Sequence, residues 1–247
     1  NKLPNELPKT EDHSILTKTF GLYASKCLLD TKDRLLRENA AKSITGHLNS
    51  LPSDKTTIWL AVCHYLEKKG LVDKIAQVYF ACIDLFKTTI EFCLDQMKKS
   101  TVIQSSVEPV VKLLVSKLGD SNAKVLNSTS DVLLMLSLQP NVGCGLIATH
   151  VLSTSSTEAG WKPVFGKLGF ALTLMSKHSV NDTNEFSEAT ILKFAKKGLE
   201  NTNGDVRMRA IAVVVEIFKL KRMKPDEFVK KNFAQLKEVQ QEQILNA

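Results

Sequence analysis

An internal repeat constrains the fold of this chain more than any other feature of its sequence. The segment Leu118-Gly-Asp-Ser-Asn-Ala-Lys-Val125 aligns with Leu199-Glu-Asn-Thr-Asn-Gly-Asp-Val206, 81 residues later. Beyond each Val, the apolar positions Val132, Leu133 and Leu136 align with Val213, Val214 and Ile217. Each segment predicts a helix that ends in Leu, a short polar turn and a second helix that opens with Val. The offset is close to two periods of about 40 to 47 residues, the spacing of HEAT and armadillo repeats.

The predicted fold class is all-α, a solenoid of about five HEAT-like helical hairpins plus a C-terminal helix. The 247 residues include only 11 Gly and 7 Pro, fewer turn residues than a sheet-rich chain of this length needs. We expect an N-terminal lead over residues 1–12 and a single repeat domain over 13–247. The predicted helices span 13–29, 34–50, 54–69, 74–99, 105–118, 122–138, 142–153, 162–178, 185–199, 205–221 and 225–243. The fifth starts with a capping box of Ser105 and Glu108.

Cysteine and histidine spacing gives no sign of a metal site. Cys27, Cys63, Cys82, Cys93 and Cys144 are odd in number, widely spaced and embedded in apolar helical pattern, so we expect reduced core residues. No pair has the short spacing of zinc ligands. We therefore expect no metal and no cofactor.

Charge and hydropathy exclude other classes of function. The net charge is +7, and no apolar run approaches the 18 or so residues of a membrane span, so we expect a cytoplasmic chain with no membrane partner. A nucleic-acid reader would need a denser basic patch or interleaved aromatic residues. Catalysis is not expected, because Gly143-Cys144-Gly145 has neither a preceding strand nor a placed base, and no phosphate-binding loop is present.

The candidate binding residues cluster at the predicted turns inside the hairpins. In a solenoid such turns line up along one edge, so their basic side chains would form a stripe able to attract an acidic partner. Trp161 lies in a polar turn and is either an exposed binding anchor or a cover for the side of the solenoid. Trp59 lies in apolar helical pattern and is predicted to be core. The basic residues are Lys32, Arg34, Lys69, Lys74, Lys124, Lys162 and Arg207.

Three short segments carry a resemblance to a known family. They are Thr19-Phe20-Gly21-Leu22-Tyr23 with Cys27-Leu28, Arg37-Glu38-Asn39-Ala40, and the polar turns at Gly119-Asp120-Ser121 and Asp205-Val206-Arg207. With the repeat pattern from His13 to about Lys221, these segments resemble TOG domains, HEAT-repeat modules that bind αβ-tubulin. The resemblance is in particular to the TOG domain of the centrosomal 104 kDa family.

The resemblance implies a function and a site. It implies non-catalytic binding of αβ-tubulin or a microtubule end by a monomeric domain, and microtubule-end regulation at the centrosome or cilium. The implied binding turns are 30–34, 69–74, 120–124, 153–162 and 200–207. The implied contact residues are Lys32, Asp33, Arg34, Lys69, Lys74, Asn122, Lys124, Trp161, Lys162, Asn203 and Arg207.

One position departs from the family pattern. Family members commonly present a large aromatic residue in the first turn, where this chain has Arg34. The alternative function is a HEAT-type scaffold that presents a different face to another acidic protein, without tubulin binding.

Overall fold

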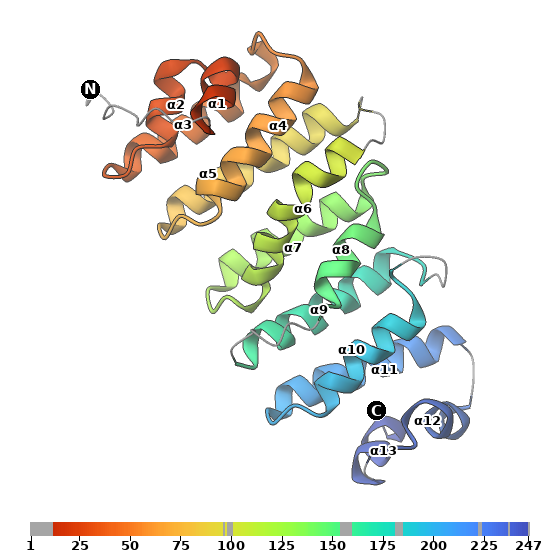
Figure 1. Cartoon of the computed structure of the whole chain (residues 1–247). Helices are drawn as coiled ribbons and strands as arrows, with labels where there is room; N and C mark the ends of the chain where they lie inside the picture. Colours follow the sequence, from red (N-terminus) through yellow and green to blue (C-terminus); the bar gives the residue numbers. More distant parts are fainter. Residues whose placement is uncertain are drawn as a thin grey trace. The chain divides into compact units, whose positions relative to one another are not determined.

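The computed structural model describes residues 12–95, 97, 101–153, 160–180, 185–221, 224–236 and 238–246, and all regular structure in them is helical. This confirms the predicted all-α class. The described chain divides into two compact units, residues 1–114 with 122–143, and residues 115–121 with 144–247. Both units consist of consecutive helix pairs (Figure 1).

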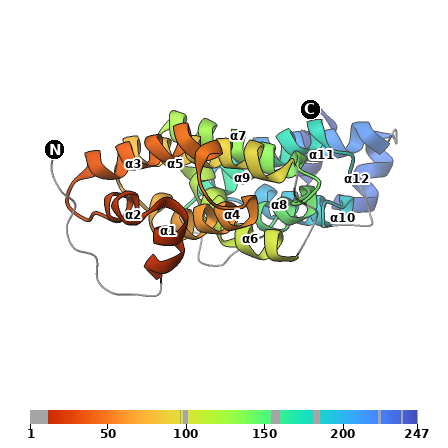
Figure 2. The same ribbon diagram turned by 90° about the horizontal axis from the view of Figure 1, so that it is seen from above.

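The first unit contains three helix pairs, preceded by a short helix. Within it, α3, α5 and α7 form one layer and α2, α4 and α6 form the other (Figure 2). Helix α5 packs on both α3 and α7. The elements are α1 (Asp12–Phe20), α2 (Leu22–Leu28), α3 (Arg34–His47), η1 (Leu48–Ser50), α4 (Lys55–Tyr65), η2 (Leu66–Gly70), α5 (Ala76–Thr89), η3 (Ile90–Leu94), α6 (Thr101–Ser116, whose last two residues belong to the second unit) and α7 (Ala123–Leu138).

The second unit contains two further pairs and two C-terminal helices. Helices α9 and α11 pack together in one layer, while α8 and α10 lie in the other (Figure 2). The elements are η4 (Lys117–Gly119), α8 (Cys144–Val151), α9 (Lys162–Lys177), α10 (Glu188–Leu199), α11 (Gly204–Lys221), α12 (Pro225–Phe233) and α13 (Glu238–Leu245).

The core is made by the residues that carry the repeat pattern. Val125, Val132 and Leu133 are buried, and so are Val206, Val213 and Val214 at the aligned positions. Trp59 is fully buried, as predicted; its indole N–H donates to Ser106 Oγ at 2.9 Å, and its ring lies 5.8 Å from that of Phe86. Burial of an aromatic ring with its polar group satisfied is a strong local contribution to the core.

Three predicted helix boundaries are wrong. The expected helix over 13–29 breaks at Gly21, whose φ of 83° is left-handed and favours glycine, so α1 and α2 are separate. Helix α6 begins at Thr101 rather than at Ser105, and Pro109 lies inside it. Burial of its apolar stripe, including Ile103 and Val107, outweighs the local capping signal.

The third wrong boundary is at the C-terminus. The expected helix over 225–243 is two helices, α12 and α13. The chain leaves the helix after Phe233 and turns at Ala234 and Gln235, and both Phe233 and Leu236 are buried. The Gln241 side-chain amide donates to the carbonyls of Ala234 and Leu236 and closes that turn. The end of the expected helix 74–99 lies partly outside the described residues.

The five cysteines are free thiols. Cys27, Cys63, Cys82 and Cys93 are buried, as expected for core residues, whereas Cys144 is half-buried. Burial raises the pKa of Cys82 and Cys93 to about 12 and that of Cys144 to about 11, because a thiolate is poorly solvated in an apolar environment.

These shifted pKa values predict slow thiol chemistry. Only the thiolate reacts, so at pH 8 Cys82 and Cys93 should react with 5,5′-dithiobis(2-nitrobenzoate) about three orders of magnitude more slowly than an ordinary cysteine. Raising the pH should speed labelling until the folded-state pKa is reached. After unfolding in guanidinium, all five should label rapidly. Rapid labelling of Cys82 or Cys93 in the folded protein, located by peptide mass spectrometry, would contradict the prediction.

Candidate functional site

The predicted contact residues lie at the turns inside the helix pairs, and all are exposed or half-buried. We describe them as two surfaces, one in each compact unit. The turn surface of the first unit comprises Lys32, Asp33, Arg34, Lys69, Lys74, Asn122 and Lys124. The turn surface of the second unit comprises Trp161, Lys162, Asn203 and Arg207.

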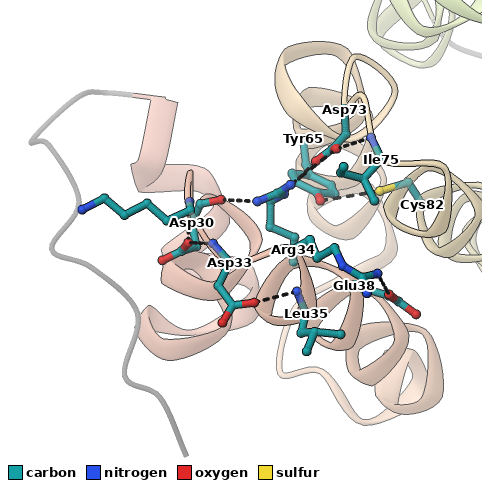
Figure 3. A network of polar contacts seen from close by, with 11 residues as sticks. Asp30, Asp33, Arg34, Leu35, Glu38, Tyr65, Asp73, Ile75 and Cys82 are labelled. Atoms are coloured by element: carbon teal, nitrogen blue, oxygen red, sulfur yellow. Dashed lines mark hydrogen bonds and ion pairs between the residues drawn. The ribbon is translucent and has the colours of Figure 1, made fainter.

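The first turn, between α2 and α3, is fixed by two aspartates. The buried Asp30 accepts the backbone N–H groups of Lys32 (2.8 Å) and Asp33 (2.6 Å) on one carboxylate oxygen. Asp33 is the N-cap of α3 and accepts the N–H of Leu35 at 2.9 Å (Figure 3). This local geometry leaves the side chains of Lys32 and Arg34 exposed, and Arg34 is 4.0 Å from Glu38, one helical turn away.

The second turn, between α4 and α5, passes through a wide helical turn before it reaches Lys74. That element, η2, ends at Gly70, where a Cβ atom would lie 2.9 Å from Cys82 Sγ and 3.1 Å from the Tyr65 ring. A larger residue at this position would push against these side chains, so the close approach of α5 favours glycine. Lys69, Val72 and Lys74 are exposed around this turn.

The third turn presents Asn122 and Lys124. Asn122 is the N-cap of α7 and accepts the N–H of Lys124 at 3.0 Å. The ammonium of Lys124 lies 4.5 Å from the centre of the Phe80 ring on α5, a cation–π contact between neighbouring helix pairs. This contact places the start of α7 beside α5 and brings Lys124 to the side of the first unit on which the second turn lies.

In the second unit, Trp161 is partly exposed, like a binding anchor, and also packs against a neighbouring side chain, like a residue that covers the solenoid. Its side chain is 37% exposed, and its ring packs edge-to-face on Phe165 at 5.7 Å. The guanidinium of Arg209, from α11, lies 3.5 Å from the centre of the Phe165 ring. Residues 154–159 of the predicted turn lie outside the described residues.

The last turn, between α10 and α11, is held by its own polar residues. Asn203 accepts the N–H groups of Asp205 (2.9 Å) and Val206 (3.2 Å). Arg207 donates to the carbonyls of Asn201 (2.9 Å) and Thr202 (2.8 Å). Arg207 is therefore a structural part of its turn as well as a surface charge, which its sequence position alone did not show.

Three residues next to these surfaces were missed by sequence reasoning. Arg37 joins the first turn to Asp73 in the second, and Arg209 on α11 contacts Phe165 on α9. Their partners lie 36 and 44 residues away, so no local spacing could reveal the pairing.

Two negative findings apply to the described part of the chain. It contains no group of three or more His, Cys, Asp or Glu side chains that could hold a metal ion. It also contains no helix with both the length and the apolar character of a membrane span.

Consecutive helix pairs with capped, polar turns define a helical-repeat module of the HEAT type. Residues 26–213 match the family model of the TOG domain of centrosomal protein CEP104. Because this match covers most of the chain, the protein belongs to the CEP104 TOG-domain family. No curated protein sequence matches the chain significantly.

Solved TOG domains share the fold at low sequence identity. The TOG domain of human Cep104 has a TM-score of 0.77 and 17% identity, covering 92% of this chain and 90% of that one. TOG3 of Mini spindles from Drosophila melanogaster has a TM-score of 0.69 and 18% identity, covering 88% of each chain. A TOG domain of Zyg9 from C. elegans has a TM-score of 0.75 and 15% identity, covering all of this chain and 89% of that one.

Proposed function

We propose that this domain binds αβ-tubulin through the turns inside its helix pairs and thereby contributes to the regulation of microtubule ends at the centrosome or cilium. Binding involves no catalysis, cofactor or metal. Membership of the TOG-domain family supports the choice of partner. The observation that carries the proposal is that exposed basic side chains extend from turns whose backbones are fixed by their own hydrogen bonds.

The proposed mechanism is recognition by a preformed surface. Asp30, Asp33 and Asn122 hold the turn backbones before any partner arrives, so binding orders few groups and loses little conformational entropy. Lys32, Lys69 and Lys74 extend into solvent, where their charge attracts an acidic surface and raises the rate of encounter.

Gel filtration of the domain with purified αβ-tubulin tests this proposal. A complex should elute ahead of either protein at low salt and weaken at moderate salt, because exposed charges are screened over roughly 10 Å at 0.1 M ionic strength. Elution of the two proteins as separate peaks at low salt would reject the proposal and favour the scaffold alternative.

The first turn supplies the observation that favours the alternative. Arg34 is exposed where the family commonly has a large aromatic residue, and it lies 4.0 Å from Glu38, at the limit of an ion pair. A scaffold for a different acidic protein would need no aromatic residue there.

Restoring the aromatic residue is expected to strengthen tubulin binding. Arg34→Trp adds a large, rigid side chain at the first residue of α3, directly after the N-cap Asp33. We expect about tenfold tighter binding. Isothermal titration with αβ-tubulin measures the change, and Arg34→Ala controls for the lost charge. Equal affinities of the tryptophan and alanine variants would show that the first turn does not contact tubulin.

A further inference from the structure

The first two turns lie on either side of a hollow, and one arginine forms hydrogen bonds to both. The hollow has a volume of about 390 Å³ and is lined on one side by Leu29 and Asp30 and on the other by Lys69 and Asp73. Arg37, on α3, also lines it and spans from one turn to the other. At this point Arg37 crosses open space and contacts both turns.

The bridge has three hydrogen bonds and little exposure to water. Arg37 Nε donates to Asp73 Oδ2 at 2.7 Å, Nη2 donates to Asp73 Oδ1 at 3.4 Å, and Nη1 donates to the Asp30 carbonyl at 3.0 Å. The side chains of Arg37 and Asp73 are only 14% and 11% exposed. A two-pronged contact of this kind needs the planar guanidinium, which a lysine cannot reproduce.

Both residues that Arg37 contacts also fix the backbone of their own turn. Asp30 holds the amides of Lys32 and Asp33, and Asp73 accepts the N–H of Ile75 at 2.8 Å (Figure 3). A change at one end of the bridge therefore affects the residue, Asp30 or Asp73, that holds the backbone of the other turn.

Behind the bridge lies Tyr65, which is 1% exposed. Burial raises the pKa of its hydroxyl well above the ordinary value; Cys82 and the Asp73 carboxylate add to the shift, and the Arg37 charge opposes it. The phenol thus stays neutral at physiological pH.

We propose that Arg37 is a positioning residue that couples the first two turns, so that Lys32 and Arg34 are presented to the partner at a set distance from Lys69 and Lys74. The tubulin part of this inference rests on the proposed function. The coupling itself is a property of the free domain.

Amide hydrogen exchange in the free domain tests the coupling without any partner. The variants are Arg37→Met, Asp73→Asn and the double variant. The double variant removes both charges, so it leaves no buried charge without its counter-charge. Asp73→Asn retains an oxygen for the Ile75 N–H. We expect each single variant to speed exchange of the Lys32 and Asp33 amides at least fivefold, and the double variant to add nothing further. An effect of Asp73→Asn confined to the second turn would overturn the proposal.

Tubulin affinity tests the consequence for binding. We expect Arg37→Met and Arg37→Lys both to weaken binding about fivefold or more, because the lysine keeps the charge but not the bridge. Ile44→Val, a small core change on the same helix, controls for a general loss of stability and should bind normally. Normal binding by Arg37→Lys would overturn the positioning role. If the unmodified domain does not bind tubulin, the proposed function fails while the exchange result still decides the coupling.

Discussion

Reversing two charges on the turn surface of the first unit is expected to weaken αβ-tubulin binding on the order of 50-fold, or about 2.3 kcal/mol. The variant is Lys32→Glu with Lys74→Glu. Both side chains are exposed, one on each side of the Arg37 bridge, and like charges facing an acidic partner are repelled. Stability should change by no more than about 0.5 kcal/mol, as is usual for exposed positions. Titration with tubulin at about 0.1 M salt and thermal unfolding measure the two quantities.

A matched variant separates local contact from overall charge. Lys177→Glu with Lys193→Glu changes the net charge by the same amount at exposed positions outside the turns. We expect this control to lower affinity only a few-fold, through weaker long-range attraction. Equal losses in the two double variants would show that tubulin responds to net charge and would remove the turns as the binding surface. Arg207 is a poor choice for such a test, because it also hydrogen-bonds the backbone of its turn.

Adding one methyl group at Gly166 is expected to destabilise the second unit by about 3 kcal/mol. Gly166 is buried on α9, and a Cβ atom there would overlap the carbonyl oxygen of Leu118 in η4. A backbone carbonyl cannot move aside as a side chain can, so α9 and η4 would have to separate. Alanine's better helix propensity, worth about 1 kcal/mol, recovers only part of the loss. Denaturant unfolding of Gly166→Ala gives the free energy of unfolding.

Gly46 is the control for this substitution. It lies on α3, is exposed, and a Cβ atom there would meet nothing within 4 Å. Gly46→Ala should therefore stabilise the domain by about 0.5 to 1 kcal/mol. A Gly166→Ala variant as stable as the unmodified protein would mean that α9 does not pack on η4 as described.

The helix pairs could be predicted from the sequence because the repeat consists of apolar residues at helical spacing on both sides of a polar turn. Val125 and Val206 each open the second helix of a pair, and both are buried as the alignment requires. The irregular positions within the helices could not be predicted from this spacing. Gly21 interrupts a continuous helical pattern through its φ of 83°, and Pro109 lies inside α6, whose apolar stripe is buried. Neither outcome follows from residue spacing alone.

The sequence pattern predicts where the turns lie, but it does not predict the interactions between turns. Positions such as Lys32 and Lys74 follow from where helices end, which sequence pattern reports well. The Arg37–Asp73 bridge and the contact of Arg209 with Phe165 join residues on different helix pairs. Such pairings depend on which helices become neighbours in space. Their contribution to tubulin binding remains a prediction.

The consecutive pairing of helices also bears on how the chain folds. Hydrogen bonds between neighbouring pairs join residues 36 apart at Arg37 and Asp73, 47 apart at Trp59 and Ser106, and 50 apart at Tyr79 and Thr129. Contacts of such short sequence separation favour rapid folding, because little chain entropy is lost before each contact forms. In the first unit, each of these bonds joins a helix pair to the pair synthesised just before it. The pairs of this unit can therefore assemble in order from the N-terminus as the chain emerges from the ribosome.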